Sequence, residues 1–316
     1  MMNRTPRNGR HLMAALATAL AGANLAIAGG PCAPNWSNAG ATLVPSTIPS
    51  PTVLALREFD PDGPGPLMRE LYIGGGFSFD GIPDAANIAR WDGFGWSDLG
   101  VNFQSGLPNN IQSEIRFMTV ARDVTSAPDR QGLYVLGGFS SVGGVSSKFI
   151  AMWNGQTWIG FPGLNFSNVG WAAAVHDFDG DGPQPPRLVI GGVFGTPAAQ
   201  LAPGFHWWDG AAWNPLGGPS RCVFRGMTSF DPDGAGPLPP RLIAAQLDRG
   251  IVEWNGTDWQ LMLADTALST VDFASLDPDG AGPLPPTLVM ARTNAPLVSM
   301  TGASPWTTES ITARTL

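Results

Sequence analysis

The 316-residue sequence predicts an all-β protein, a single β-propeller of four-stranded blades. Three repeated features predict it: a tryptophan hairpin, a glycine-rich strand ahead of each hairpin, and an aspartate-rich turn further upstream. The composition fits this fold class, because 41 glycines and 30 prolines divide the chain into short segments. Charged residues make up only 13% of the chain, too few for a disordered polyelectrolyte.

The tryptophan hairpins place Asp-Gly or Asn-Gly between two tryptophans five positions apart. They are Trp91–Trp96, Trp153–Trp158, Trp208–Trp213 and Trp254–Trp259. Asp-Gly and Asn-Gly are strong hairpin signals, because they tolerate the positive φ angles of a tight turn. The first tryptophans follow one another at intervals of 62, 55 and 46 residues, which favours propeller blades over helical solenoid units.

A glycine-rich strand precedes each hairpin. Its copies begin at Leu71, Leu133 and Leu188, with weaker copies at Leu242 and Leu288. The apolar opening of each copy predicts a strand that is covered on both faces. The glycines that follow in the stronger copies indicate a bulge or the close approach of another backbone.

An aspartate-rich turn lies further upstream, and its copies begin at Asp60, Asp177, Asp231 and Asp277. In all four copies the glycine-rich strand begins 11 residues after the first aspartate. Proline and glycine favour the turn, and we expect the aspartates to cap it by accepting hydrogen bonds from nearby backbone N–H groups. The second unit has residues 123–131 in place of this turn. An apolar lead strand precedes each turn, so every unit holds four strands.

Five such units cover residues 52–100, 115–163, 170–218, 221–264 and 268–310. The fifth keeps only Trp306 of its hairpin. Trp36–Gly40 matches Trp96–Gly100 and predicts a solitary fourth strand within an N-terminal segment, residues 29–51. Such a strand would complete the last blade and close the ring of repeats over residues 52–316. We expect five blades, with six as the alternative if the solitary strand and Ile311–Leu316 are remnants of a sixth.

Residues 1–28 have the pattern of a signal peptide. Three arginines stand among the first ten residues, an apolar run extends from Leu12 to Ala28, and Ala26-Ile27-Ala28 supplies the cleavage pattern. The run is too short and too interrupted for a transmembrane anchor. The sequence therefore predicts a secreted or periplasmic protein with no membrane span in the mature chain.

The formal net charge is −8, and removal of residues 1–28 with their three arginines makes it −11. An acidic surface repels phosphate backbones, so nucleic acid is not an expected partner. Cys32 and Cys222 both lie in the exported part, where a disulfide can form. They stand 190 positions apart, and the sequence leaves open whether they pair.

The repeat resembles a known family. The glycine-rich strand, Ile88 to Gly93 (Ile-Ala-Arg-Trp-Asp-Gly) and the second tryptophan together resemble the kelch-like, galactose-oxidase-type propeller repeats of bacterial secreted proteins. The resemblance covers most of the mature chain and implies a propeller fold. Copper oxidase chemistry is not carried over, because it needs clustered His and Tyr ligands. Without residues 1–28 the chain has only His176 and His206, and we expect Tyr72 and Tyr134 to pack within their strands.

The aspartate-rich turns are similar to the FG-GAP repeats of integrin-type propellers, whose Asp-x-Asp-x-Asp-Gly loops bind calcium. Residues 177–182 are the full match, and the resemblance implies Asp177, Asp179 and Asp181 as ligands. The other turns replace the third aspartate with Pro64, Ala235 or Ala281. Pro185 stands where a further carboxylate is expected, although Ca²⁺ takes six to eight oxygens. Turn 177–182 is therefore the candidate calcium site, and an ion-free turn is the alternative.

No catalytic constellation stands out in the sequence. The lead strands carry Glu58 and Asp272 without a repeated pattern, and we expect both to be structural rather than a glycosidase pair. The tryptophans are expected to pack between blades rather than to bind sugar rings. We predict a non-catalytic secreted binding or scaffold protein, a monomer whose ligand is a protein or a glycan. A secreted carbohydrate-active hydrolase or lyase on a propeller scaffold is the alternative.

Three long connections between the glycine-rich strand and the first tryptophan strand bear on ligand binding. They are Ser78–Asn87, Ser140–Lys148 and Gly195–Gly204, and the fourth and fifth units have almost no residues there. In a propeller these connections emerge on the same end, so they can share a ligand. Tolerated surface insertions are the alternative, because loop length costs little free energy.

Overall fold

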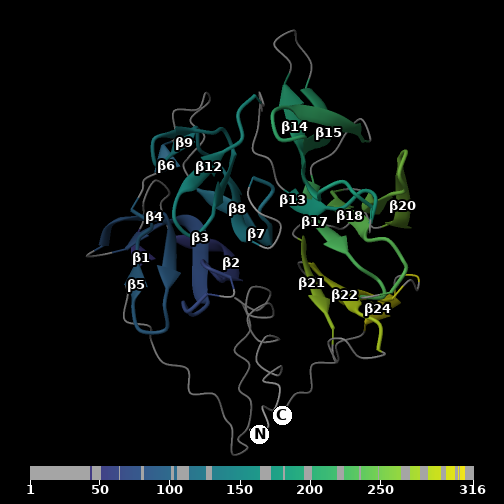
Figure 1. The fold of residues 1–316 in the computed structure, drawn as a ribbon, viewed down its shortest axis with the longest axis horizontal. Coiled ribbons are helices and arrows are strands. Elements are labelled where there is room, and N and C mark those ends of the chain that lie inside the picture. Colours follow the sequence, from purple (N-terminus) through teal and green to yellow (C-terminus); the bar gives the residue numbers. More distant parts are fainter. Residues whose placement is uncertain are drawn as a thin grey trace, which may run out of the picture.

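The computed structural model describes most of the chain beyond residue 50. The described residues are 43–44, 51–63, 65–79, 82–100, 103–104, 114–125, 130–163, 172–180, 182–195, 201–218, 224–234, 236–247, 249–264, 271–277, 284–292, 297–302, 305 and 307–309. They form strands and turns, and no helix occurs among them (Figure 1). The predicted signal peptide and the predicted solitary strand at Trp36–Gly40 lie outside these residues.

The strands form five antiparallel sheets of four strands each, which we number along the chain. The first sheet holds β2(Thr52–Phe59), β3(Glu70–Phe79), β4(Ile82–Trp91) and β5(Trp96–Ser97), with β1(Leu43–Val44) as an addition. The second holds β7(Ile115–Arg122), β8(Gln131–Gly137), β11(Ile150–Trp153) and β12(Trp158–Gly160). The third holds β13(Ala172–His176), β14(Arg187–Gly195), β15(Leu201–Trp208) and β16(Trp213–Gly217).

The fourth sheet holds β17(Phe224–Phe230), β18(Arg241–Gln246), β19(Gly250–Trp254) and β20(Trp259–Ala264). The fifth holds β21(Val271–Leu276), β22(Thr287–Arg292), β23(Leu297–Thr301) and β24(Thr307–Glu309). A small sixth sheet joins β6(Phe103–Gln104), β9(Ser141–Val142) and β10(Val145–Ser146). The predicted units of four strands are therefore confirmed, each in the order lead strand, glycine-rich strand, first and second tryptophan strand.

The lead strands β2, β7, β13, β17 and β21 lie toward the middle of the molecule (Figure 1). Each contacts the lead strand of the following sheet. An ion pair joins the two ends of this series, since Nη2 of Arg57 on β2 lies 2.8 Å from Oδ1 of Asp272 on β21. The first and fifth sheets, 215 positions apart at this pair, are thereby linked.

The N-terminal strand β1 pairs with the first sheet rather than the last. Leu43 and Val44 stand opposite Phe79 and Ser78 at the far end of β3. The fifth sheet takes its fourth strand, β24, from its own unit. The predicted closing strand, Trp36–Gly40, lies outside the described residues, so its pairing with the last blade stays a prediction.

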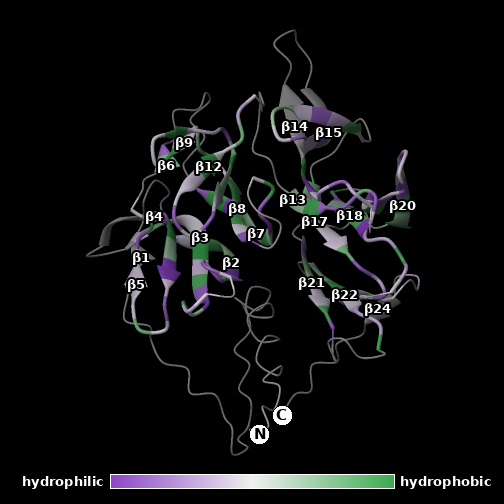
Figure 2. Cartoon of the chain, in the orientation of Figure 1, coloured by the Kyte–Doolittle hydropathy of each residue, from purple (hydrophilic) through white to green (hydrophobic). Residues whose placement is uncertain are grey.

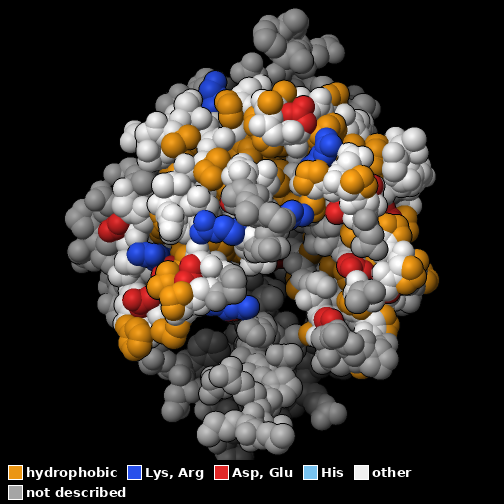
Figure 3. Space-filling model, viewed as in Figure 1, with side chains coloured by type: hydrophobic (Ala, Val, Ile, Leu, Met, Phe, Trp, Pro, Cys, Tyr) orange, Lys and Arg blue, Asp and Glu red, His pale blue; other side chains and the backbone are white. Residues whose placement is uncertain are grey.

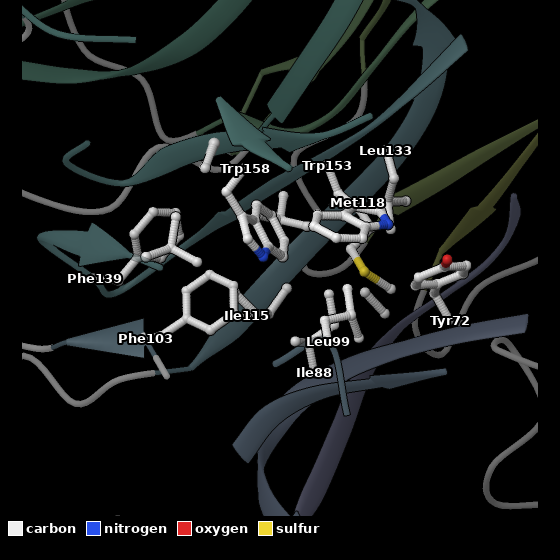
Figure 4. Close-up of a cluster of buried hydrophobic side chains, with 14 of the residues drawn as sticks. Tyr72, Ile88, Leu99, Phe103, Ile115, Met118, Leu133, Phe139, Trp153 and Trp158 are labelled. Atoms are coloured by element: carbon white, nitrogen blue, oxygen red, sulfur yellow. The ribbon is translucent and has the colours of Figure 1, made fainter. Parts of the chain in front are cut away.

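Hydrophobic side chains fill the spaces between consecutive sheets. Between the first and second sheets, Trp153 and Trp158 lie side by side, with Met118 and Tyr72 beyond Trp153 and Phe103 below Trp158 (Figure 4). Further clusters lie between the second and third, third and fourth, and fourth and fifth sheets. Figure 2 shows hydrophobic residues along the strands and polar residues in many connections. The free energy of burying this apolar area holds neighbouring sheets together.

Four of the eight hairpin tryptophans are buried in the core, and the other four are partly buried. In every hairpin the two rings face each other across the strand pair, with ring centroids 5.2 to 5.7 Å apart. Trp153, Trp158, Trp208 and Trp259 are buried between sheets, which confirms their predicted role in packing. The turns use the conformational freedom of glycine alone. Only the glycines have positive φ, while the preceding Asp or Asn accepts hydrogen bonds from the next backbone N–H groups.

The glycine-rich strands contain glycine because the lead strand passes too close for a side chain. A Cβ at Gly75 would overlap with the carbonyl oxygen of Thr52, and one at Gly137 with that of Glu114. The register shifts beside these contacts, between Val53 and Ala55 in the first sheet, so the predicted bulge is present as well.

Candidate functional site

The chain direction divides each sheet into two ends. Because the strands alternate in direction, the aspartate-rich turns and the tryptophan hairpin turns emerge on one end, called the turn end below. The connections from the glycine-rich strand to the first tryptophan strand emerge on the other, the loop end. The predicted calcium site belongs to the turn end, and the predicted binding connections belong to the loop end.

The aspartate-rich turns share one hydrogen-bond pattern. Oδ2 of Asp62, Asp179 and Asp233 accepts the N–H of the residue five positions later at 3.0 to 3.1 Å. The next glycine has φ near +65°, at +66°, +61° and +67° in the three turns. The aspartates therefore cap the turns as predicted, and the pattern does not depend on a third aspartate.

The candidate calcium site contributes two described ligands, because Asp181 lies outside the described residues. Oδ1 of Asp177 accepts the N–H of Asp179 at 3.2 Å. Burial raises the pKa of Asp177, and the neighbouring carboxylate of Asp179 raises it further. Oδ1 of Asp179 is buried without a hydrogen-bond partner, which fits a cation at this position.

The same orphaned oxygen recurs in turns without a third aspartate. Oδ1 of Asp62 and Oδ1 of Asp233 are also buried without a hydrogen-bond partner. Within the described ranges no group of three or more His, Cys, Asp or Glu side chains is placed to hold a metal ion. Turn 177–182 also has a raised pKa at Asp177, caused first by burial and further by the neighbouring Asp179, and a bound cation would oppose both effects.

A buried histidine lies directly beneath this turn. Nδ1 of His176 is 2.9 Å from Oγ of Ser229, which connects β13 to β17 of the next sheet. The His176 ring meets Phe178 edge-on, with centroids 4.8 Å apart. Burial lowers the pKa of His176 from 6.5 to about 4, so the imidazole is neutral at pH 7. A His–Ser contact can activate a serine, but His176 is only 4% exposed, and this contact serves to join two sheets.

Sequence reasoning did not find the His176–Ser229 pair. His176 stands one position before the aspartate-rich turn of the third sheet, and Ser229 stands two positions before that of the fourth sheet. The repeats place both residues at the turn end of neighbouring lead strands. Their contact depends on the stagger between two sheets, which no spacing within one unit records.

The other residues considered for chemistry are engaged in structural contacts. Nη1 of Arg69 lies 3.4 Å from Oε1 of Glu58, and Asp272 pairs with Arg57. The hydroxyl of Tyr72 donates to Glu70 at 2.6 Å, and burial raises its pKa. The hydroxyl of Tyr134 donates to the carbonyl of Arg122 at 2.8 Å, again with a pKa raised by burial. Both tyrosines are fully buried, which confirms that they pack.

The three predicted binding connections on the loop end are largely folded. Around the first, β3 runs to Phe79 and β4 starts at Ile82, and around the third, β14 runs to Gly195 and β15 starts at Leu201. These two connections are thus extensions of strand pairs, with residues 80–81 and 196–200 outside the described part.

The second connection, Ser140–Lys148, folds back on the molecule. It forms the β9–β10 ribbon that pairs with β6, and the N–H of Ser140 donates to the carbonyl of Gln104 at 2.7 Å. Val142 is fully buried in the cluster between the first and second sheets. This connection is therefore part of the core and offers less free surface than its length predicted.

No protein-family model matches the chain, and no curated protein matches its sequence. The resemblance to kelch-like and FG-GAP repeats stays a prediction. In the part of the chain that the structure describes, no helix is long and apolar enough to cross a membrane. Cys32 and Cys222 both lie outside that part, so their pairing stays open.

Proposed function

We propose that the protein is a non-catalytic binding module that acts outside the cytoplasm, on a closed ring of five blades. The observation that carries the binding role is the pair of elongated hairpins, β3–β4 and β14–β15, which project from the loop end of a repeated scaffold. Hairpins of unequal length on one end of a rigid scaffold are where binding surfaces usually form. Export rests on the signal-peptide pattern of residues 1–28.

Closure of the ring is supported by the ion pair between Arg57 and Asp272. The two residues belong to the first and last lead strands, and their side chains are 24% and 37% exposed, respectively. A row of five sheets without closure would leave the outer faces of the first and fifth sheets open to water, which a ring avoids. Contacts between successive lead strands connect the first sheet to the fifth through the three sheets between them.

A non-catalytic role is supported by the contacts of the carboxylates on the lead strands. A glycosidase needs two carboxyl groups that face a substrate, whereas Glu58 and Asp272 each form an ion pair with an arginine. His176 is likewise enclosed between sheets.

The ligand class is a protein or a glycan, and a single set of proteins tests it. The mature protein and two variants, with residues 78–87 or 195–204 replaced by short turns, are applied to a glycan array and to extracellular protein fractions. Binding that is lost in a shortened variant supports the proposal. Binding by all three proteins alike contradicts the role of the hairpins, and turnover of a polysaccharide in a reducing-sugar assay contradicts the non-catalytic role.

A further inference from the structure

Exposed leucines recur at one position of the aspartate-rich turns. Leu67, Leu238 and Leu284 each stand seven positions after the first aspartate, and they are 59%, 44% and 54% exposed. Figure 3 shows hydrophobic side chains scattered widely over one face of the molecule, so exposure alone singles out nothing. The repetition of one residue at one turn position does.

The turn holds these side chains in a fixed place. The N–H of Leu67 donates to Oδ2 of Asp62 at 3.1 Å, and the N–H of Leu238 donates to Oδ2 of Asp233 at 3.0 Å. In the turn of the third sheet, Gln184 takes the same position and makes the same backbone hydrogen bond. The turn therefore needs a backbone donor at this position but not a leucine.

The three leucines belong to neighbouring sheets. Leu238 follows β17 of the fourth sheet, Leu284 follows β21 of the fifth, and Leu67 follows β2 of the first. The lead strands of the fourth and fifth sheets are in contact, and the Arg57–Asp272 ion pair joins the fifth to the first. Sheets four, five and one thus carry leucine at the turn end, while the third sheet carries Gln184.

The turns and hairpins of the turn end are strongly acidic in sequence. The four turns, each through its seventh following residue, and the four hairpins contain twelve aspartates and no lysine or arginine. The arginines next to these turns are already engaged: Arg69 with Glu58, Arg241 with Glu253, and Arg187 with the ring of Trp207. Hydrogen bonds from backbone N–H groups lower the pKa of the exposed Asp92 and Asp209, which keeps these carboxylates charged.

We propose that Leu67, Leu238 and Leu284 form a docking surface for a cationic, amphipathic polypeptide segment. Its apolar side chains cover the leucines, and its lysines or arginines meet the aspartates around them. An anionic lipid surface would be repelled by the same carboxylates. A glycan is disfavoured at these positions because sugar rings stack on aromatic side chains, and the three exposed residues are leucines.

This inference rests on the binding role proposed above but uses the opposite end of the molecule. The test variant carries Leu67→Gln, Leu238→Gln and Leu284→Gln together, a change that the turn of the third sheet already accommodates with Gln184. The control variant carries Leu261→Gln and Met262→Gln on β20, which removes side chains of similar exposure, 44% and 41%. Melting curves establish that both variants are folded.

Three labelled probes are measured by fluorescence anisotropy or co-sedimentation: an amphipathic leucine–lysine peptide, a leucine–glutamate peptide of the same pattern, and phosphatidylglycerol vesicles. We expect the leucine–lysine peptide to bind the native protein and the control variant equally, and the test variant at least tenfold more weakly. Equal affinity for the test variant, equal affinity of the glutamate peptide, or vesicle binding that the test variant loses each overturns the proposal. Loss of ligand binding after shortening of the loop-end hairpins is a separate result, because those variants keep the turn end intact.

Discussion

The buried histidine between the third and fourth sheets makes the fold sensitive to acid. His176 has a pKa of about 4 in the folded protein and 6.5 when exposed in the unfolded chain. As pH falls below 6.5, His176 takes up a proton in the unfolded state but stays neutral in the folded state, so the free energy of unfolding decreases. The loss continues until pH 4, where the folded state is protonated as well. The two pKa values correspond to a loss of about 2.5 kcal/mol at pH 4.5, and about 3 kcal/mol in full.

His176→Asn is the matched variant, because an amide can still hydrogen-bond to Oγ of Ser229 and does not titrate. The free energy of unfolding is measured in urea, with tryptophan fluorescence as the signal. Between pH 7 and pH 4.5 we expect it to fall by about 2.5 kcal/mol more in the native protein than in the variant. His206, whose pKa burial also lowers, is common to both proteins. Asp177 has a raised pKa and acts in the opposite direction, since its folded form takes up a proton first. Equal losses in the two proteins would refute a neutral, buried His176.

Three further predictions concern the turn end and the closure of the ring. Millimolar Ca²⁺ added to protein treated with EDTA should raise the melting temperature of the native protein but not that of the Asp181→Ala variant, whose turn then resembles the one that begins at Asp231. A calcium titration without heat or thermal shift would indicate an ion-free turn. Asp272→Lys should lower the free energy of unfolding by about 1 kcal/mol, because the partly exposed ion pair links the first and fifth sheets. Adding Arg57→Asp should restore most of that loss, and no recovery in this double-mutant cycle argues against the link. Gly155→Ala should lower the melting temperature more than Gly256→Ala, because both glycines have positive φ (+93° and +97°) but only the first meets the Pro61 carbonyl of the neighbouring sheet; equal shifts contradict this contact.

The sheets could be predicted because the sequence pattern within each unit is enough to indicate the order of its strands. The spacing of 11 residues from the first aspartate to the glycine-rich strand holds in four units, and all five units fold as four-stranded sheets in the predicted order. Hairpin tryptophans were expected in the core, since large aromatics at a fixed place in every repeat are needed where sheets pack. These features depend on the period of side chains along strands and on turn chemistry, which a single sequence contains.

Features that depend on contacts between units could not be predicted in the same way. The Ser140–Lys148 connection was expected to be a free surface loop, but β6 lies beside it and pairs with β9. Nothing within the loop marks this pairing, since β6 consists of two residues in the linker between the first and second units. The ion pair of Arg57 and Asp272 could not be predicted for the same reason. In the sequence both residues are ordinary charged residues, and only the structure places them next to each other.

At the turn end, the residues that the turn itself requires can be separated from those that it does not require. Aspartate is needed because its carboxylate caps the turn, and glycine is needed because φ is positive. The seventh position must supply a backbone N–H, which every residue except proline has, and Gln184 supplies it as well as Leu238 does. Turn formation thus accounts for the aspartates and glycines but leaves the exposed leucines without a cause. The recurrence of an apolar residue at this half-exposed position is the observation that the proposed docking partner would explain.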